Sequence, residues 1–268
     1  MRLLRTVAVT FALYSRIPMP HFEWRDEDMT YSIALFPWVG AVIGLVFVCV
    51  YRAGILLSVP LTAVCLLMTA VPVVITGGFH IDGIMDVSDA LSSYGSREDK
   101  LRILKDPHIG AFAVIRLCVC GLVYMASLIT LAGSAKISAA GSAYEAVLIL
   151  AAGFFTARAF SALGVLNLRS AKNEGMLFYE ASCAGSGRKA NNILCSLWIC
   201  AVSILIIYID PVMGIAEMLT AAACFAWYKY KCYKEFGGIT GDTAGWFVTV
   251  CETALAAAAA LVCLSRGL

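Results

Sequence analysis

The sequence predicts an all-α, polytopic integral membrane protein, a bundle of about seven transmembrane helices with active-site loops on the cytoplasmic side. Hydrophobic residues make up 61% of the 268 residues, charged residues only 14%, and the mean hydropathy is +0.84. The apolar residues form runs long enough to cross a bilayer, which soluble globular domains do not contain. We therefore expect residues 1–268 to form a single integral membrane domain in contact with lipid.

Hydropathy gives seven candidate spans, and the two central pairs are close enough that six or eight also fit. The spans are residues 33–57, 61–79, 111–133, 144–165, 193–209, 212–228 and 244–264. In the first span, Gly40 and Gly44 form a small-x-x-x-small face typical of helix packing.

Residues 1–32 are predicted to be an interfacial segment ahead of the first span. Apolar residues at helical spacing alternate there with Arg2, Arg5 and Arg16, as in a helix lying on a membrane surface. A signal peptide is the rival interpretation. We set it aside because no small-x-small cleavage site follows, and Pro18 and Pro20 block continuation of the helix.

The distribution of Lys and Arg predicts the orientation. With the N-terminus inside, fifteen basic residues fall in loops on one side, against three on the other, Arg52, Lys136 and Arg266. The positive-inside rule therefore places the N-terminus, the 80–109 loop and the loops around 166–189 and 228–243 in the cytoplasm. We expect these loops to form one site.

The cysteines and the net charge exclude other classes. Most of the eleven cysteines lie inside apolar runs, no Cys-x-x-Cys pair occurs, and the chain has only three histidines. Neither a disulfide framework nor a zinc site is indicated. A net charge of +2 gives no reason to expect a nucleic-acid partner.

One polar stretch, residues 77–90, interrupts the apolar chain. If it is helical from Asp82 onward, Asp82, Asp86 and Asp89 lie at i, i+4 and i+7 and share one face. Such clustered charges favour a cation, and Mg²⁺ takes a few carboxylates and completes its shell with water and phosphate oxygens. We therefore predict a metal site, with Gly83 leaving room for a phosphate. The alternative is a solvated helix start with scattered acidic residues.

Other marked residues are expected on the same side. Arg158 lies in the inner half of its span, where a cation usually faces a partner or a ligand, and we expect it to meet phosphate. Arg116, near the inner end of its span, could equally extend to lipid head groups. The turn from Gly237 to Asp242 offers backbone N–H groups and an acid at a helix start, although such a turn is also an ordinary cap.

The chain resembles the cobalamin synthase family, the adenosylcobinamide-GDP ribazoletransferases, in four collinear motifs. They are Arg16-Ile-Pro-Met-Pro, Gly77-Gly78-Phe79-His80-x-Asp82-Gly83-Ile84-x-Asp86-x-x-Asp89, Lys105-Asp106-x-x-Ile109-Gly110 and Gly237-Gly238-Ile239-Thr240-Gly241-Asp242. The chain departs from the family at Ala90, where a glycine is usual, and at Pro107-His108, often Ser-Arg.

The resemblance implies a Mg²⁺-dependent inner-membrane transferase in the last steps of cobamide nucleotide-loop assembly. The enzyme would transfer the cobinamide phosphate of adenosylcobinamide-GDP to α-ribazole, or its 5′-phosphate, giving adenosylcobalamin, or its 5′-phosphate, and GMP. The implied metal ligands are Asp82, Asp86, Asp89 and Asp242, and the implied catalytic base is His80 or Asp89. The implied substrate contacts are Gly83, Lys105, Arg158, Lys172 and Gly241.

Two alternatives remain from the sequence. A lipid head-group transferase like the CDP-alcohol phosphotransferases also places aspartates at a membrane edge, but the Ala-Arg that follows Asp-Gly in that signature is absent. A membrane cation or metabolite transporter would need acids buried in the spans or a repeated half, and we find no internal repeat. A homo-oligomer is left open.

Overall fold

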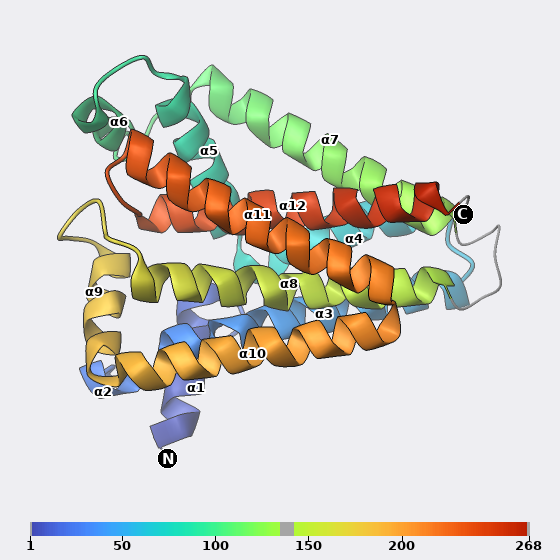
Figure 1. The fold of residues 1–268 in the computed structure, drawn as a ribbon, viewed down its shortest axis with the longest axis horizontal. Helices are drawn as coiled ribbons and strands as arrows, with labels where there is room; N and C mark the ends of the chain where they lie inside the picture. Colours follow the sequence, from blue (N-terminus) through green and yellow to red (C-terminus); the bar gives the residue numbers. More distant parts are fainter. Residues whose placement is uncertain (1, 135–141, 267–268) are drawn as a thin grey trace.

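The computed structural model describes residues 2–134 and 142–266, which form a helical bundle (Figure 1). Within these two ranges, six helices are long and apolar enough to cross a membrane. They are α3 (Ser32–Leu56), α7 (Ala111–Ser134), α8 (Ser142–Asn167), α10 (Arg188–Ile209), α11 (Pro211–Glu235) and α12 (Gly241–Ser265). Within the described ranges the only β-type pairing is an isolated bridge between Ser170 and Ile239. The predicted fold class, a polytopic helical membrane bundle, is confirmed.

A seventh span depends on how a broken helix is counted. α4 (Leu61–Thr76) and α5 (Phe79–Ser92) pass the membrane test together but are bent by 92°. Gly77 and Gly78 lie between them with φ of 68° and 82°, a left-handed conformation that glycine adopts without strain. The apolar run therefore stops at Thr76 rather than Phe79, and α5 crosses the end of the bundle instead of continuing the span (Figure 1).

The polar segments gather at one end of the bundle, away from the C-terminal end of α12 (Figure 1). The elements there include α1 (Arg2–Tyr14), α2 (Asp26–Met29), α5, α6 (Arg97–Ile103) and α9 (Met176–Cys183), which leads through η1 (Ala184–Gly187) into α10. This grouping matches the predicted common site. The membrane side that this end faces stays a prediction, and Lys136 lies outside the described residues.

The core depends on close contact between α3 and α8. A side chain at Gly40 would collide with the backbone of Phe154, and one at Gly44 with the backbone of Ala151. The predicted packing role of this small-residue face is confirmed, because only glycine permits such an approach.

The N-terminal segment is fixed to the site end. Arg5 contacts Asp28 at 2.7 Å, which ties α1 to α2. At the end of α1, the backbone N–H of Arg16 donates to Ile75 at 2.8 Å, and the Arg16 side chain packs over Gly77. The first family motif therefore lies against the turn that redirects the chain into α5.

Candidate active site

The site is built where α5 crosses the start of α12. A side chain at Gly83 would lie 2.6 Å from the backbone oxygen of Asp242 and 3.0 Å from the amide nitrogen of Trp246. The hydroxyl of Thr249 donates to the backbone oxygen of His80 at 3.0 Å. Gly83 therefore has a packing function at this crossing, and its predicted contact with phosphate stays a prediction.

Three aspartates project from α5, and a fourth begins α12. Helical spacing puts Asp82, Asp86 and Asp89 on one face, and the helix begins earlier than expected, at Phe79. Partial burial and the charges of Asp82, Asp242 and Asp89 raise the pKa of Asp86 to about 6. The Asp86 carboxylate thus interacts electrostatically with the other three carboxylates at this crossing.

Asp89 has a structural partner that the sequence did not reveal. Its carboxylate accepts hydrogen bonds from the backbone N–H groups of Gly110 at 2.7 Å and Ala113 at 2.9 Å. Asp89 therefore caps the beginning of α7, where N–H groups have no partner within the helix. This capping role explains why an aspartate stands at this position even if it binds no metal. Its carboxylate oxygens can still accept further ligands.

The start of α12 is capped by Thr240 and not by Asp242. The Thr240 hydroxyl accepts a hydrogen bond from the backbone N–H of Thr243 at 3.2 Å. The Thr243 hydroxyl in turn accepts one from the backbone N–H of Thr240 at 2.8 Å. Asp242 contacts the Thr240 hydroxyl at 3.4 Å and is half-buried. A side chain at Gly241 would meet open space, so the backbone there is accessible.

The basic loops meet beside this crossing. Ile239 and the chain at Arg169 and Ala171 exchange backbone hydrogen bonds of 2.8 and 2.9 Å, which joins two loops far apart in sequence. Lys105 pairs with Glu174 at 2.6 Å, and both side chains are largely exposed.

Lys172 is the more buried of the two predicted lysines. Its ammonium lies 3.4 Å from the backbone oxygen of Leu101. Burial and the charge of Lys105 lower the pKa of Lys172, while Asp242 and Glu174 act in the opposite direction. Lys172 is therefore near enough to Asp242 to interact with it electrostatically.

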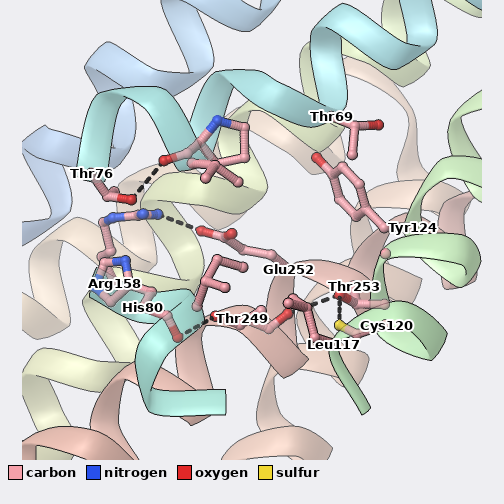
Figure 2. Close-up of a pocket in the computed structure, with 14 residues that line it drawn as sticks. Thr69, Thr76, His80, Leu117, Cys120, Tyr124, Arg158, Thr249, Glu252 and Thr253 are labelled. Atoms are coloured by element: carbon pink, nitrogen blue, oxygen red, sulfur yellow. Dashed lines mark hydrogen bonds and ion pairs between the residues drawn. The ribbon is translucent and has the colours of Figure 1, made fainter. Parts of the chain in front are cut away.

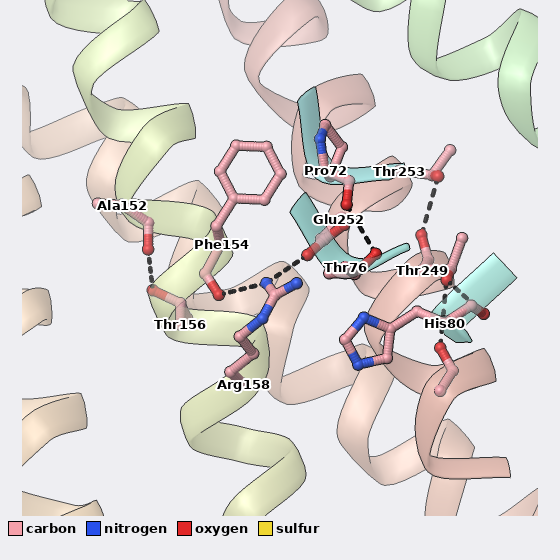
Figure 3. Close-up of polar contacts among 11 residues, drawn as sticks. Pro72, Thr76, His80, Ala152, Phe154, Thr156, Arg158, Thr249, Glu252 and Thr253 are labelled. Atoms are coloured by element: carbon pink, nitrogen blue, oxygen red, sulfur yellow. Dashed lines mark hydrogen bonds and ion pairs between the residues drawn. The ribbon is translucent and has the colours of Figure 1, made fainter. Parts of the chain in front are cut away.

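His80 and Arg158 lie together inside the bundle, on the other side of α5. Two residues on a helix are about 200° apart, so His80 faces away from Asp82. His80 is only 5% exposed, and Arg158 is fully buried. The Arg158 guanidinium donates to Glu252 at 2.6 Å and to the Phe154 carbonyl at 2.9 Å (Figure 3). The charge of Arg158 is thus already balanced, which weakens the expectation that it meets phosphate.

The partner of Arg158 is a residue to which sequence reasoning assigned no role. Glu252 is an acid within an apolar run, the signal by which it could have been found. Glu217, in α11, is a second such acid: it is 2% exposed, and neither carboxylate oxygen has a partner among the described residues.

The carboxylates fit Mg²⁺ only if water and substrate phosphate oxygens supply the rest of its coordination shell. Among the described residues, no group of three or more His, Cys, Asp or Glu side chains is already arranged to hold a metal ion. Mg²⁺ is usually held by one or two carboxylates together with water and substrate phosphates, which needs no complete protein cage. Asp82 is exposed and Asp86 half-buried, so both are available for such a shell.

Fold and site define a polytopic membrane protein with clustered acids and lysines at one end of its bundle. The chain belongs to the family described as cobalamin-5-phosphate synthase, whose sequence model matches residues 6–260. The resemblance carried by the four motifs is thereby confirmed.

Similar proteins span almost the whole chain. A protein of Lachnoclostridium phytofermentans, named adenosylcobinamide-GDP ribazoletransferase, is 39% identical over 254 residues, 94% of this chain and 92% of that protein. Proteins of the same name from Clostridium perfringens strain SM101 and Pseudomonas savastanoi pv. phaseolicola are 29% and 31% identical, over 92% and 89% of this chain and 94% and 91% of their own lengths. No solved structure matches the chain.

Proposed function

We propose that the protein is a Mg²⁺-dependent adenosylcobinamide-GDP ribazoletransferase of the cell inner membrane. It transfers the cobinamide phosphate of adenosylcobinamide-GDP to α-ribazole or its 5′-phosphate, and releases GMP. Family membership and the names of the relatives support this reaction. The structural observation that carries it is the crossing of α5 and α12, which gathers four aspartates beside the basic loops.

Phosphoryl transfer to an alcohol requires charge stabilisation more than covalent chemistry from the protein. Asp82, Asp86 and Asp242 would hold Mg²⁺, which when bound would neutralise charge on the diphosphate. Asp89 would position α7 and contribute a free lone pair. Lys172, already beside Asp242, would contact a phosphate oxygen.

Two further roles are part of the proposal. Lys105 would exchange its exposed partner Glu174 for phosphate, since exposed ion pairs contribute little stability. Gly241 would offer an open backbone at a helix start, where anions are favoured. His80 or Asp89 would accept the proton of the attacking hydroxyl.

The polar end would face the cytoplasm, where the nucleotide substrate is available. The fifteen-to-three distribution of basic residues supports this orientation. The exposed apolar side chains of α7 and α10, such as Phe112, Leu122, Leu197 and Ile204, would contact lipid.

The reaction is tested with purified protein, adenosylcobinamide-GDP, α-ribazole and Mg²⁺. We expect GMP release that needs both substrates and stops with a chelator. Asp86→Asn should lower the rate at least about tenfold, because a metal ligand is lost. A CDP-alcohol as donor should give no CMP. If the wild-type protein released CMP from that donor and no GMP, it would be a lipid head-group transferase instead.

A further inference from the structure

A cavity of 280 Å³ lies between α4, α7, α8 and α12 (Figure 2), and His80 of α5 is part of its lining. Its polar lining includes Tyr124, Arg158 and Glu252, and its apolar lining includes Val73 and Leu117. Sites of this kind, mostly apolar with a few polar groups, are typical of small-molecule binding.

The cavity is lined by residues whose polar atoms lack a partner. Arg158 is 0% exposed and Tyr124 is 7% exposed. Among the described residues, Arg158 Nε, Arg158 Nη2 and Tyr124 Oη have no hydrogen-bond partner. Leaving buried donors unpaired is costly, so this arrangement favours a bound group that carries hydrogen-bond acceptors.

The charge balance indicates that the bound group is neutral. The Arg158 guanidinium is already paired with Glu252 at 2.6 Å, and the pair together carries no net charge. A phosphate here would meet the Glu252 carboxylate without a free cation to compensate it. The lysines at the end of the bundle are better placed for phosphates.

His80 connects this cavity with the proposed reaction site. It also lines a second cavity of 110 Å³, together with Gly241 and Ala244 at the start of α12. His80 therefore stands between the larger cavity and the helix start that carries Asp242.

We infer that the larger cavity binds the neutral heterocyclic base of the acceptor nucleoside, with Tyr124 or Arg158 donating a hydrogen bond to the one ring nitrogen that does not carry the sugar. The inference rests on the proposed function, because α-ribazole is the substrate with a neutral, largely apolar ring. The bulky corrinoid donor would stay outside this cavity, at the acidic crossing.

The test is binding of α-ribazole alone to the full-length protein in detergent, measured by titration calorimetry without the second substrate. Gly121 lines the cavity, and a side chain there would meet no atom within 4 Å, so Gly121→Leu should fill the cavity without disturbing the backbone. We expect its Kd for α-ribazole to rise at least about tenfold. Tyr124→Phe should raise Kd about three- to tenfold, the effect of one neutral hydrogen bond.

Gly133→Leu is the matched control, because Gly133 lies on the same helix, away from the cavity lining, and is equally unobstructed. Its Kd should equal that of the wild type. In turnover, Gly121→Leu should raise KM for α-ribazole and leave KM for adenosylcobinamide-GDP unchanged. Unchanged α-ribazole binding in both cavity variants would overturn the inference. Binding without any GMP release by the wild type would instead refute the proposed reaction.

Discussion

Arg158 of α8 and Glu252 of α12 form an ion pair of 2.6 Å in which the arginine is fully buried and the glutamate side chain is 11% exposed. The pair joins two long helices in the bundle interior, beside the cavity. A buried pair of this kind need not stabilise the fold, but removing one partner leaves the other charge uncompensated.

Glu252→Gln is therefore expected to destabilise the protein by about 3–5 kcal/mol, seen as a lower Tm in detergent. The double variant Arg158→Met/Glu252→Met should recover most of the loss, because no charge then remains unpaired. An unchanged Tm for Glu252→Gln would mean that Glu252 is already neutral in the folded protein.

Gly83→Ala should disturb the crossing of α5 and α12. The new methyl group would lie 2.6 Å from the Asp242 carbonyl, a backbone atom that cannot move alone. We expect a loss of about 1–3 kcal/mol in stability and reduced GMP release. Gly133→Ala, where the added group meets no neighbour, should melt like the wild type. Equal Tm values for the two variants would contradict this packing role.

The Asp242→Asn variant distinguishes between two roles of Asp242, as a metal ligand and as a helix cap. Because Thr240 supplies the cap, the variant should stay folded and melt normally. If Asp242 helps to hold Mg²⁺, GMP release should fall at least about tenfold and partly recover at higher Mg²⁺, as for Asp86→Asn. An active Asp242→Asn enzyme with an unchanged Mg²⁺ dependence would remove this residue from the site.

The Arg5–Asp28 contact predicts a pH-dependent attachment of α1. The hydrogen bond from Arg5 lowers the pKa of Asp28 below its usual 3.8. The stabilisation is therefore complete above about pH 5, one unit above the unfolded-state pKa, and is lost as pH falls through the lower folded-state pKa. Tm measured from pH 6 to pH 3 should fall more steeply for the wild type than for Asp28→Asn. Parallel curves would show that the contact contributes nothing.

The orientation can be checked by cysteine labelling in a cysteine-free background. Ser96 and Ser265 are both exposed and, by the charge count, lie on opposite sides of the membrane. Ser96→Cys should react only with permeant reagent in intact cells, and Ser265→Cys with impermeant reagent as well. Accessibility of both positions from the same side would mean that the helix count is wrong by one.

The sequence by itself determined the class of fold and the family. Long apolar runs have no stable arrangement in lipid other than helices or closed barrels, so hydropathy alone located the spans, although α10 begins five residues before its predicted span and α11 ends seven residues after its own. It also located the aspartates of α5 on one face, because helical spacing is a local property. The grouping of the basic loops at one end followed from the alternation of spans.

Only the tertiary structure decided which side chains meet. The contacts of Asp89 with Gly110, of Arg158 with Glu252 and of Gly83 with Asp242 join residues far apart in the chain. No periodicity encodes such pairs, since they depend on how α5, α8 and α12 cross. The 92° turn after Thr76 likewise depends on two adjacent glycines adopting positive φ, which apolar composition does not reveal. The turn directs His80 toward Arg158 and away from the carboxylates. Residue spacing alone did not decide whether His80 would lie on the carboxylate side of α5.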